Sequence, residues 1–118
     1  KREEVLSRID RGAAIFNQRA YALAFCPSGE GQKPAPLVTV DCENVELSCF
    51  KQSERSERVY ILRLFEGQGI ATTAKVEIPV ASAAFEAEFN PFEIKTFRLE
   101  DGKVTETDML EGAVELPQ

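Results

Sequence analysis

Short stretches in which hydrophobic and polar residues alternate recur along most of the chain. Since successive side chains of a β-strand point to opposite faces of the sheet, this alternation predicts strands with one buried face. It is clearest where Phe85, Ala87 and Phe89 are separated by single glutamates. Patterns of this kind predict strands at residues 20–25, 37–40, 45–50, 58–66, 70–78, 84–89, 92–99 and 104–109.

Turn residues separate the predicted strands at short intervals. The pair Asp101-Gly102 is the strongest hairpin signal, and Asn90-Pro91 marks another turn. Short connections favour antiparallel pairing, and this strand spacing is typical of sandwiches and barrels. We therefore predict a mostly β fold, a two-layer antiparallel β-sandwich of about eight strands with a short N-terminal helix.

The helix is predicted from a different periodicity. The apolar residues Val5, Ile9, Ala13 and Phe16 recur at intervals of three and four, which places them on one helical face. We expect this stripe to pack on the domain or on a neighbouring one. The predicted organisation is a helical or linking segment at residues 1–17, a sandwich at residues 20–110 and a loose tail at residues 111–118 within a single domain, residues 1–118.

The alternation also predicts the core. Residues 58–66 are nearly continuous in apolar side chains, so we expect a central strand covered on both sides. A slip of one residue would exchange the two faces of that strand. The predicted core includes Leu23, Leu47, Ile61, Val76, Phe85 and Ile94.

Composition narrows the range of partners. A net charge of −6 argues against nucleic acid and against an anionic membrane surface, since both favour a basic face. No apolar run approaches the roughly 20 residues that cross a bilayer. The three cysteines, Cys26, Cys42 and Cys49, form no Cys-x-x-Cys pair, so we expect reduced structural thiols and a cytoplasmic location.

Candidate chemistry is sparse. The sequence has no His, which is the commonest general base and metal ligand. The pair Gly29 and Gly31 lacks the third glycine and the Lys-Ser/Thr ending of a phosphate loop, so it predicts a surface loop. We predict no catalytic, cofactor-binding or metal site in this chain. Five acidic residues could supply the carboxylate pair of a glycosidase, but their alternate positions on strands favour solvated sheet faces. They are Glu86, Glu88, Glu93, Glu106 and Asp108. Their expected cross-strand partners are Arg58, Arg63 and Arg98.

Several ordered segments carry a family resemblance. They read Asp-Cys-Glu-Asn-Val-Glu-Leu-Ser-Cys-Phe-Lys at 41–51, Tyr-Ile-Leu-Arg-Leu-Phe-Glu at 60–66 and Asn-Pro-Phe-Glu-Ile-Lys-Thr-Phe-Arg-Leu at 90–99. Together with residues 104–111, they resemble the C-terminal β domain of glycoside hydrolase family 38 α-mannosidases. The resemblance spans residues 20–111.

The resemblance implies a supporting role. In that family the zinc ligands and the nucleophilic aspartate belong to an N-terminal domain, so none is transferred to a residue of this chain. The chain would be a non-catalytic C-terminal domain packed against the catalytic and middle domains of a larger retaining α-mannosidase. We expect it to be part of a longer polypeptide, and to expose apolar surface through which it can also form homodimers. Two alternatives remain, an independent carbohydrate-binding module and an immunoglobulin-like scaffold domain.

Overall fold

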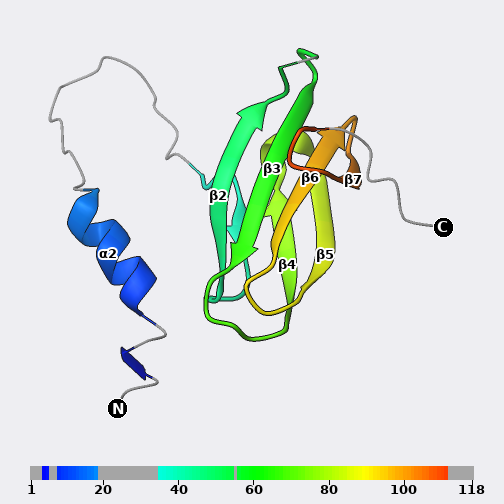
Figure 1. Ribbon diagram of the computed structural model, residues 1–118. Coiled ribbons are helices and arrows are strands. Elements are labelled where there is room, and N and C mark those ends of the chain that lie inside the picture. Colours follow the sequence, from blue (N-terminus) through cyan, green and yellow to red (C-terminus); the bar gives the residue numbers. More distant parts are fainter. Residues whose placement is uncertain (1–3, 6–7, 19–34, 55, 112–118) are drawn as a thin grey trace, which may run out of the picture. The chain divides into compact units, whose positions relative to one another are not determined.

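The computed structural model describes residues 4–5, 8–18, 35–54 and 56–111. These residues belong to two compact units, Lys1–Pro36 and Leu37–Gln118. The first unit contains the helix α2, Ile9–Asn17, drawn in blue in Figure 1. No residue of α2 is buried within the structure, and its apolar residue Phe16 is exposed. The predicted helix is therefore confirmed, whereas the packing of its apolar stripe stays a prediction.

The second unit is a sandwich of two antiparallel sheets. Its strands are β1 (Thr39–Val40), β2 (Val45–Gln52), β3 (Val59–Glu66), β4 (Thr72–Ile78), β5 (Ala83–Phe89), β6 (Ile94–Glu100) and β7 (Lys103–Thr107). One sheet has the order β1-β4-β5 and the other β2-β3-β6-β7. The predicted fold class is confirmed, with seven described strands. The strand predicted at residues 20–25 lies outside the described residues.

The connections divide the sandwich into two different ends. The links after β1, β3 and β5 each cross from one sheet to the other, whereas β2–β3, β4–β5 and β6–β7 pair within a sheet. Because consecutive strands run in opposite directions, the three crossings meet at one end, the lower end in Figure 1. We call this the crossover end, formed by residues 41–44, 67–71 and 90–93. We call the opposite end the hairpin end, formed by the turns after β2, β4 and β6.

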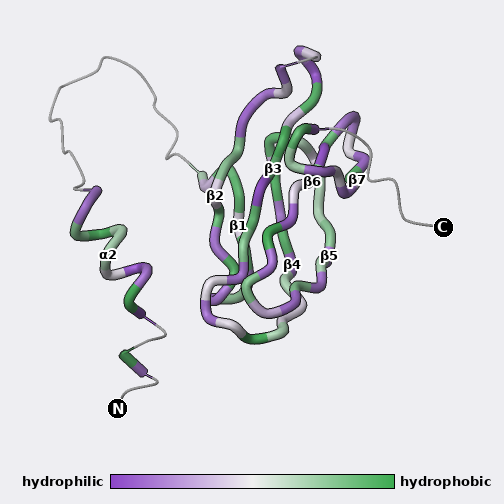
Figure 2. The backbone as a smooth tube through the Cα atoms, viewed as in Figure 1, coloured by the Kyte–Doolittle hydropathy of each residue, from purple (hydrophilic) through white to green (hydrophobic). Residues whose placement is uncertain are grey.

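The core lies between the two sheets. Figure 2 shows hydrophobic and hydrophilic positions following one another along the strands, as the alternation predicted. The rings of Phe85 and Phe97 bridge the sheets, with centroids 4.8 Å apart. The buried cluster consists of Val45, Leu62, Leu64, Ala74, Val76, Ile78, Ala83, Ala87, Phe89, Phe97 and Leu99.

The outer face of the four-stranded sheet is also partly covered. Ile61 is fully buried although it points away from the core cluster. Residues 108–111 run back across this face: Arg63 donates to the Met109 carbonyl over 3.0 Å, and the Ser53 hydroxyl donates to Glu111 over 2.8 Å. The expectation of a central strand covered on both sides is confirmed for the half of β3 that contains Val59 and Ile61, whereas Arg63 and Phe65 in the other half are only half-buried. Glu111, predicted to begin a loose tail, is instead held in place.

Two of the predicted core residues are exposed. Leu47 is 47% exposed because it lies at a register shift in β2, which is an edge strand. Ile94 is 53% exposed, since it begins β6 on the outer face opposite Phe65, where no described segment covers it. The alternation predicted each strand correctly but not how far the cover over its outer face extends.

The other predicted core residues agree with the structure. Ile61 and Val76 are fully buried, and Phe85 is half-buried against the cluster. Leu23 lies outside the described residues.

Candidate functional site

The most highly organised polar group of the described chain is the carboxylate of Glu66, the last residue of β3. Its side chain is only 1% exposed. Oε1 accepts hydrogen bonds from the backbone N–H of Gln68 over 2.8 Å and from Asn44 Nδ2 over 3.2 Å. Oε2 accepts from the backbone N–H groups of Gly69 over 2.7 Å and Phe92 over 2.9 Å. Both oxygens therefore have two donors each.

These donors decide the charge of Glu66. Burial of the carboxylate would by itself raise its pKa. The backbone N–H groups of Phe92, Gln68 and Ile70, with the Asn44 side chain, outweigh burial and lower the pKa to about 2. Glu66 is therefore ionised at neutral pH, and its lone pairs are occupied by the protein itself. Such a carboxylate is suited to holding structure together and not to transferring protons.

Glu66 joins all three crossings between the sheets. Asn44 comes from the connection after β1, Gly69 from the connection after β3 and Phe92 from the connection after β5. Backbone bonds reinforce the junction, since Glu66 N donates to the Glu93 carbonyl and Gly67 N donates to the Asn44 carbonyl, each over 2.9 Å. We call this set the Glu66 junction.

Close packing at the junction requires a glycine. Gly69 has a positive φ of +75°, and a Cβ built on it would lie 2.6 Å from the Phe92 ring. Phe92 itself has φ 60°, which is unusual for a residue with a side chain. Its ring is 71% exposed and lies over Gly69. The backbone of both residues is thus held in the left-handed region so that their N–H groups reach Glu66.

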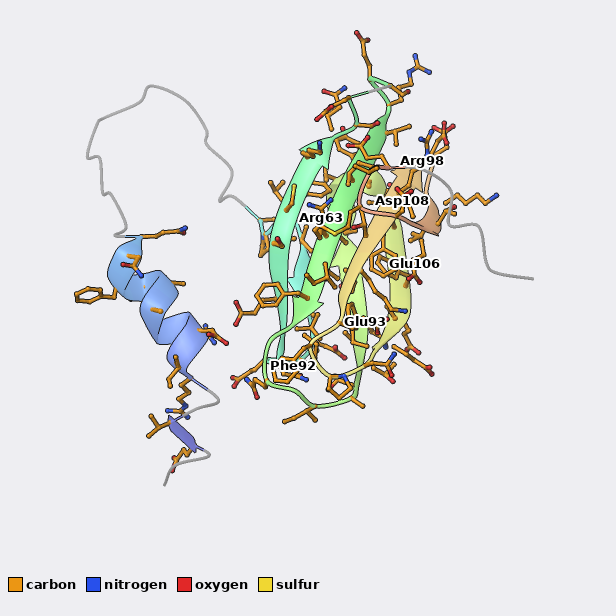
Figure 3. The ribbon with its side chains drawn as sticks, viewed as in Figure 1. Arg63, Phe92, Glu93, Arg98, Glu106 and Asp108 are labelled. Carbon is orange, nitrogen blue, oxygen red and sulfur yellow. The ribbon has the colours of Figure 1, made fainter. Side chains whose placement is uncertain are left out.

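An apolar surface lies beside the junction. Ile70 is 56% exposed and adjoins Gly69, and Phe92 and Ile94 are more than half exposed on the strand and turn that follow. We call Ile70, Phe92 and Ile94 the crossover-end apolar surface. Figure 3 labels Phe92 at this end of the sandwich.

The predicted arginine–carboxylate pairs are wrong. Arg63 bonds to Thr96 Oγ1 over 3.1 Å and to a carbonyl, and Arg98 pairs with Glu100 on its own strand over 3.1 Å. Arg58 has no ion pair with a described residue. The pattern showed which residues carry charge, but cross-strand register decides which of them meet.

Lysines, and not arginines, pair with two of the predicted carboxylates. Lys75 lies 3.8 Å from Glu86 and Lys95 lies 3.4 Å from Glu106 across neighbouring strands. Glu88 is exposed on β5, as expected of a solvated sheet face.

The remaining two predicted carboxylates hold turns. Glu93 accepts from the Asn90 backbone N–H over 2.7 Å, and Asp108 accepts from the Leu110 N–H over 2.9 Å. Figure 3 shows Glu93 at the crossover end, whereas Asp108 lies in the other half of the sheet. These two carboxylates therefore serve different turns and not a common site.

Metal-ligating residues do not gather in the described part of the chain. Among those residues, no group of three His, Cys, Asp or Glu side chains is placed to hold a metal ion. Cys42 and Cys49 are free thiols, and burial raises the pKa of Cys42. Cys26 and the loop glycines Gly29 and Gly31 lie outside the described residues.

Sequence reasoning missed the role of Glu66. The signal was present, because an acidic residue that ends a buried strand and precedes Gly-Gln-Gly, residues 67–69, has free backbone N–H groups next to it. Comparison with known proteins adds nothing to this geometry: no family model, curated protein or solved structure matches the chain. No helix within the described ranges has the length and apolar character needed to span a membrane.

Proposed function

We propose that this chain is a non-catalytic β-sandwich domain of a larger cytoplasmic α-mannosidase of glycoside hydrolase family 38. The observation that carries the proposal is the Glu66 junction. Asn44 belongs to the first segment that carries the resemblance, Glu66 to the second and Phe92 to the third. Segments far apart in the sequence thus meet at one buried carboxylate, which gives their order and residue types a shared physical purpose.

The crossover-end apolar surface supports a packing role. Ile70, Phe92 and Ile94 lie at the end of the sandwich that the hydrogen bonds of the Glu66 junction tie together. Apolar patches on a protein surface are typical of interaction sites, and these three exposed side chains are available to a partner. In the proposed role, the catalytic and middle domains of the longer polypeptide cover this surface, and a homodimer covers it when the chain is alone.

In this proposal, zinc and the catalytic carboxylates come from other parts of the polypeptide. Retaining hydrolysis needs two carboxyl groups about 5 to 5.5 Å apart across a sugar-sized pocket. The carboxylates of this sandwich are used differently, since Glu66 is fully hydrogen-bonded by backbone and Asn44, and Glu93 holds a turn. The contribution of this chain is therefore mechanical support.

The proposal is tested by assaying the chain and the longer polypeptide side by side. The substrate is an aryl α-mannoside, with and without a chelator. We expect no turnover and no zinc binding by the chain alone, and chelator-sensitive turnover by the longer polypeptide. Turnover by the chain would contradict the supporting role, and an inactive longer polypeptide would contradict the family assignment.

A surface substitution provides a second readout of the same proposal. Ile94→Glu places a charge on the crossover-end apolar surface and leaves the core cluster intact. It is expected to lower the thermal stability of the longer polypeptide while leaving that of the isolated chain within a few degrees. The matched control is Glu88→Lys, at an exposed position of the other sheet.

A further inference from the structure

The hairpin end of the sandwich contains a pocket of about 420 Å³. This volume is within the range of small-molecule sites and is ample for one sugar ring. The half-buried Tyr60 of β3 contributes surface, and the buried Leu99 lies opposite it on β6. The other principal lining residues are Arg58, Val80, Ser82 and Asp101.

Two turns with unusual backbone conformations border the pocket. Ser82 follows the short 3-10 helix η1, Pro79–Ala81, and has φ 49°, the same value as Asp101 in the β6–β7 hairpin. A Cβ built on Gly102 would lie 3.6 Å from the Ser82 carbonyl oxygen, so the two turns are in close contact. The pocket therefore lies where turns from both sheets meet.

The polar groups that line this pocket have no partners within the described residues. The Arg58 guanidinium, the Asp101 carboxylate and the hydroxyls of Ser82 and Tyr60 form no hydrogen bond or ion pair there. Arg58 and Asp101 border the same pocket without pairing with one another. Each of these groups remains available to a ligand.

The chemistry of the four groups selects the ligand class. A guanidinium only donates hydrogen bonds and an ionised carboxylate only accepts them, whereas a hydroxyl does both. A ligand with several neighbouring hydroxyls satisfies Arg58 and Asp101 together, and their opposite charges do not call for a charged ligand. Tyr60 and Val80 offer apolar surface to the C–H face of such a ring. We infer that this pocket binds a neutral saccharide.

A free amino acid is the competing ligand, because it presents an ammonium and a carboxylate to the same two charges. Arg58 and Asp101 are both solvent-exposed, and ion pairs in that setting contribute little. The two hydroxyls and the apolar surface of Tyr60 would also remain unused. The saccharide fits more of the lining. This inference does not depend on the proposed mannosidase role, since the site lies at the opposite end from the crossover-end apolar surface.

The test is a titration of the isotopically labelled chain by two-dimensional NMR. The probes are the methyl α-glycosides of mannose, glucose and galactose, with L-alanine as the zwitterionic alternative. We expect saturable shifts in the millimolar range at Tyr60, Ser82 and Gly102. Arg58→Met and Asp101→Asn should each weaken binding by about two- to fivefold, since each removes one solvent-exposed hydrogen-bonding partner. Asn is chosen because it tolerates the positive φ of Asp101.

The matched control is Lys103→Gln, a change of charge next to the hairpin but outside the pocket lining. It should leave the affinity for the glycosides unchanged, and well-dispersed spectra show that each variant is folded. Four results would overturn the inference. They are the absence of localised shifts, shifts centred outside the pocket, an affinity of Arg58→Met and Asp101→Asn equal to that of the unaltered chain, and binding of L-alanine without binding of any glycoside. Because only the chain itself is titrated, the outcome is separate from the α-mannoside assay.

Discussion

The two ends of the sandwich use similar residues for opposite purposes. At the crossover end, the carboxylate of Glu66 is buried and accepts four hydrogen bonds from the protein. At the hairpin end, the carboxylate of Asp101 is exposed and has no partner among the described residues. Both ends contain residues at positive φ. The difference teaches that a charged group is committed to architecture where its neighbours satisfy it, and is open to a ligand where they leave it without a partner.

Removal of the Glu66 side chain is the largest test of this comparison. Glu66→Ala leaves the buried N–H groups of Gln68, Gly69 and Phe92 without their acceptor and opens space at the junction. We expect the free energy of unfolding to fall by about 3 to 5 kcal/mol, measured by urea unfolding. The exposed control Glu88→Ala should change it by less than about 0.5 kcal/mol. Equal effects of the two substitutions would contradict an architectural role for Glu66.

The strands were predictable from the sequence because alternation reports directly on which face of a strand is buried. The prediction was weakest where cover depends on another segment. The sequence around Ile94 does not indicate that residues 108–111 leave it uncovered, and the sequence around Leu47 does not indicate the register shift in β2. Packing between distant segments therefore decides the burial of these two residues, which periodicity alone does not predict.

The candidate site was predictable only in part. The segments at 60–66 and 90–99 were identified by their residue types, but the hydrogen bonds between Glu66 and Phe92 depend on how the crossings meet. Asp101 was assigned to a hairpin turn, which is correct, and its place in a pocket with Arg58 depends on the position of a turn from the other sheet. The pattern within one segment cannot predict contacts between segments that are distant in the sequence.

Acid should weaken the crossover end selectively. The folded pKa of Glu66 is about 2 against an ordinary value of 4.5, so its contribution is fully present above the ordinary value and is lost as the pH falls towards 2. The shift corresponds to about 3 kcal/mol of stability. Unfolding by urea at pH 6, 4 and 2.5 should show a loss that Glu66→Gln lacks, because its amide does not titrate over this range. An identical acid dependence of both proteins would show that other groups are responsible.

The smallest expected effect on stability comes from replacing one glycine at each end of the sandwich by alanine. Gly69 and Gly102 have nearly equal φ values, +75° and +77°, so an alanine at either position carries a similar backbone strain of about 1 kcal/mol. Only at Gly69 would the new Cβ also meet the Phe92 ring, at 2.6 Å, whereas at Gly102 the nearest atom is 3.6 Å away. Gly69→Ala should therefore cost more, by up to about 1 kcal/mol, because the exposed ring must move from its place over the junction. In a Phe92→Ala background this excess should disappear, and equal costs of the two glycine substitutions in the unaltered chain would show that the ring does not pack tightly at the crossover end.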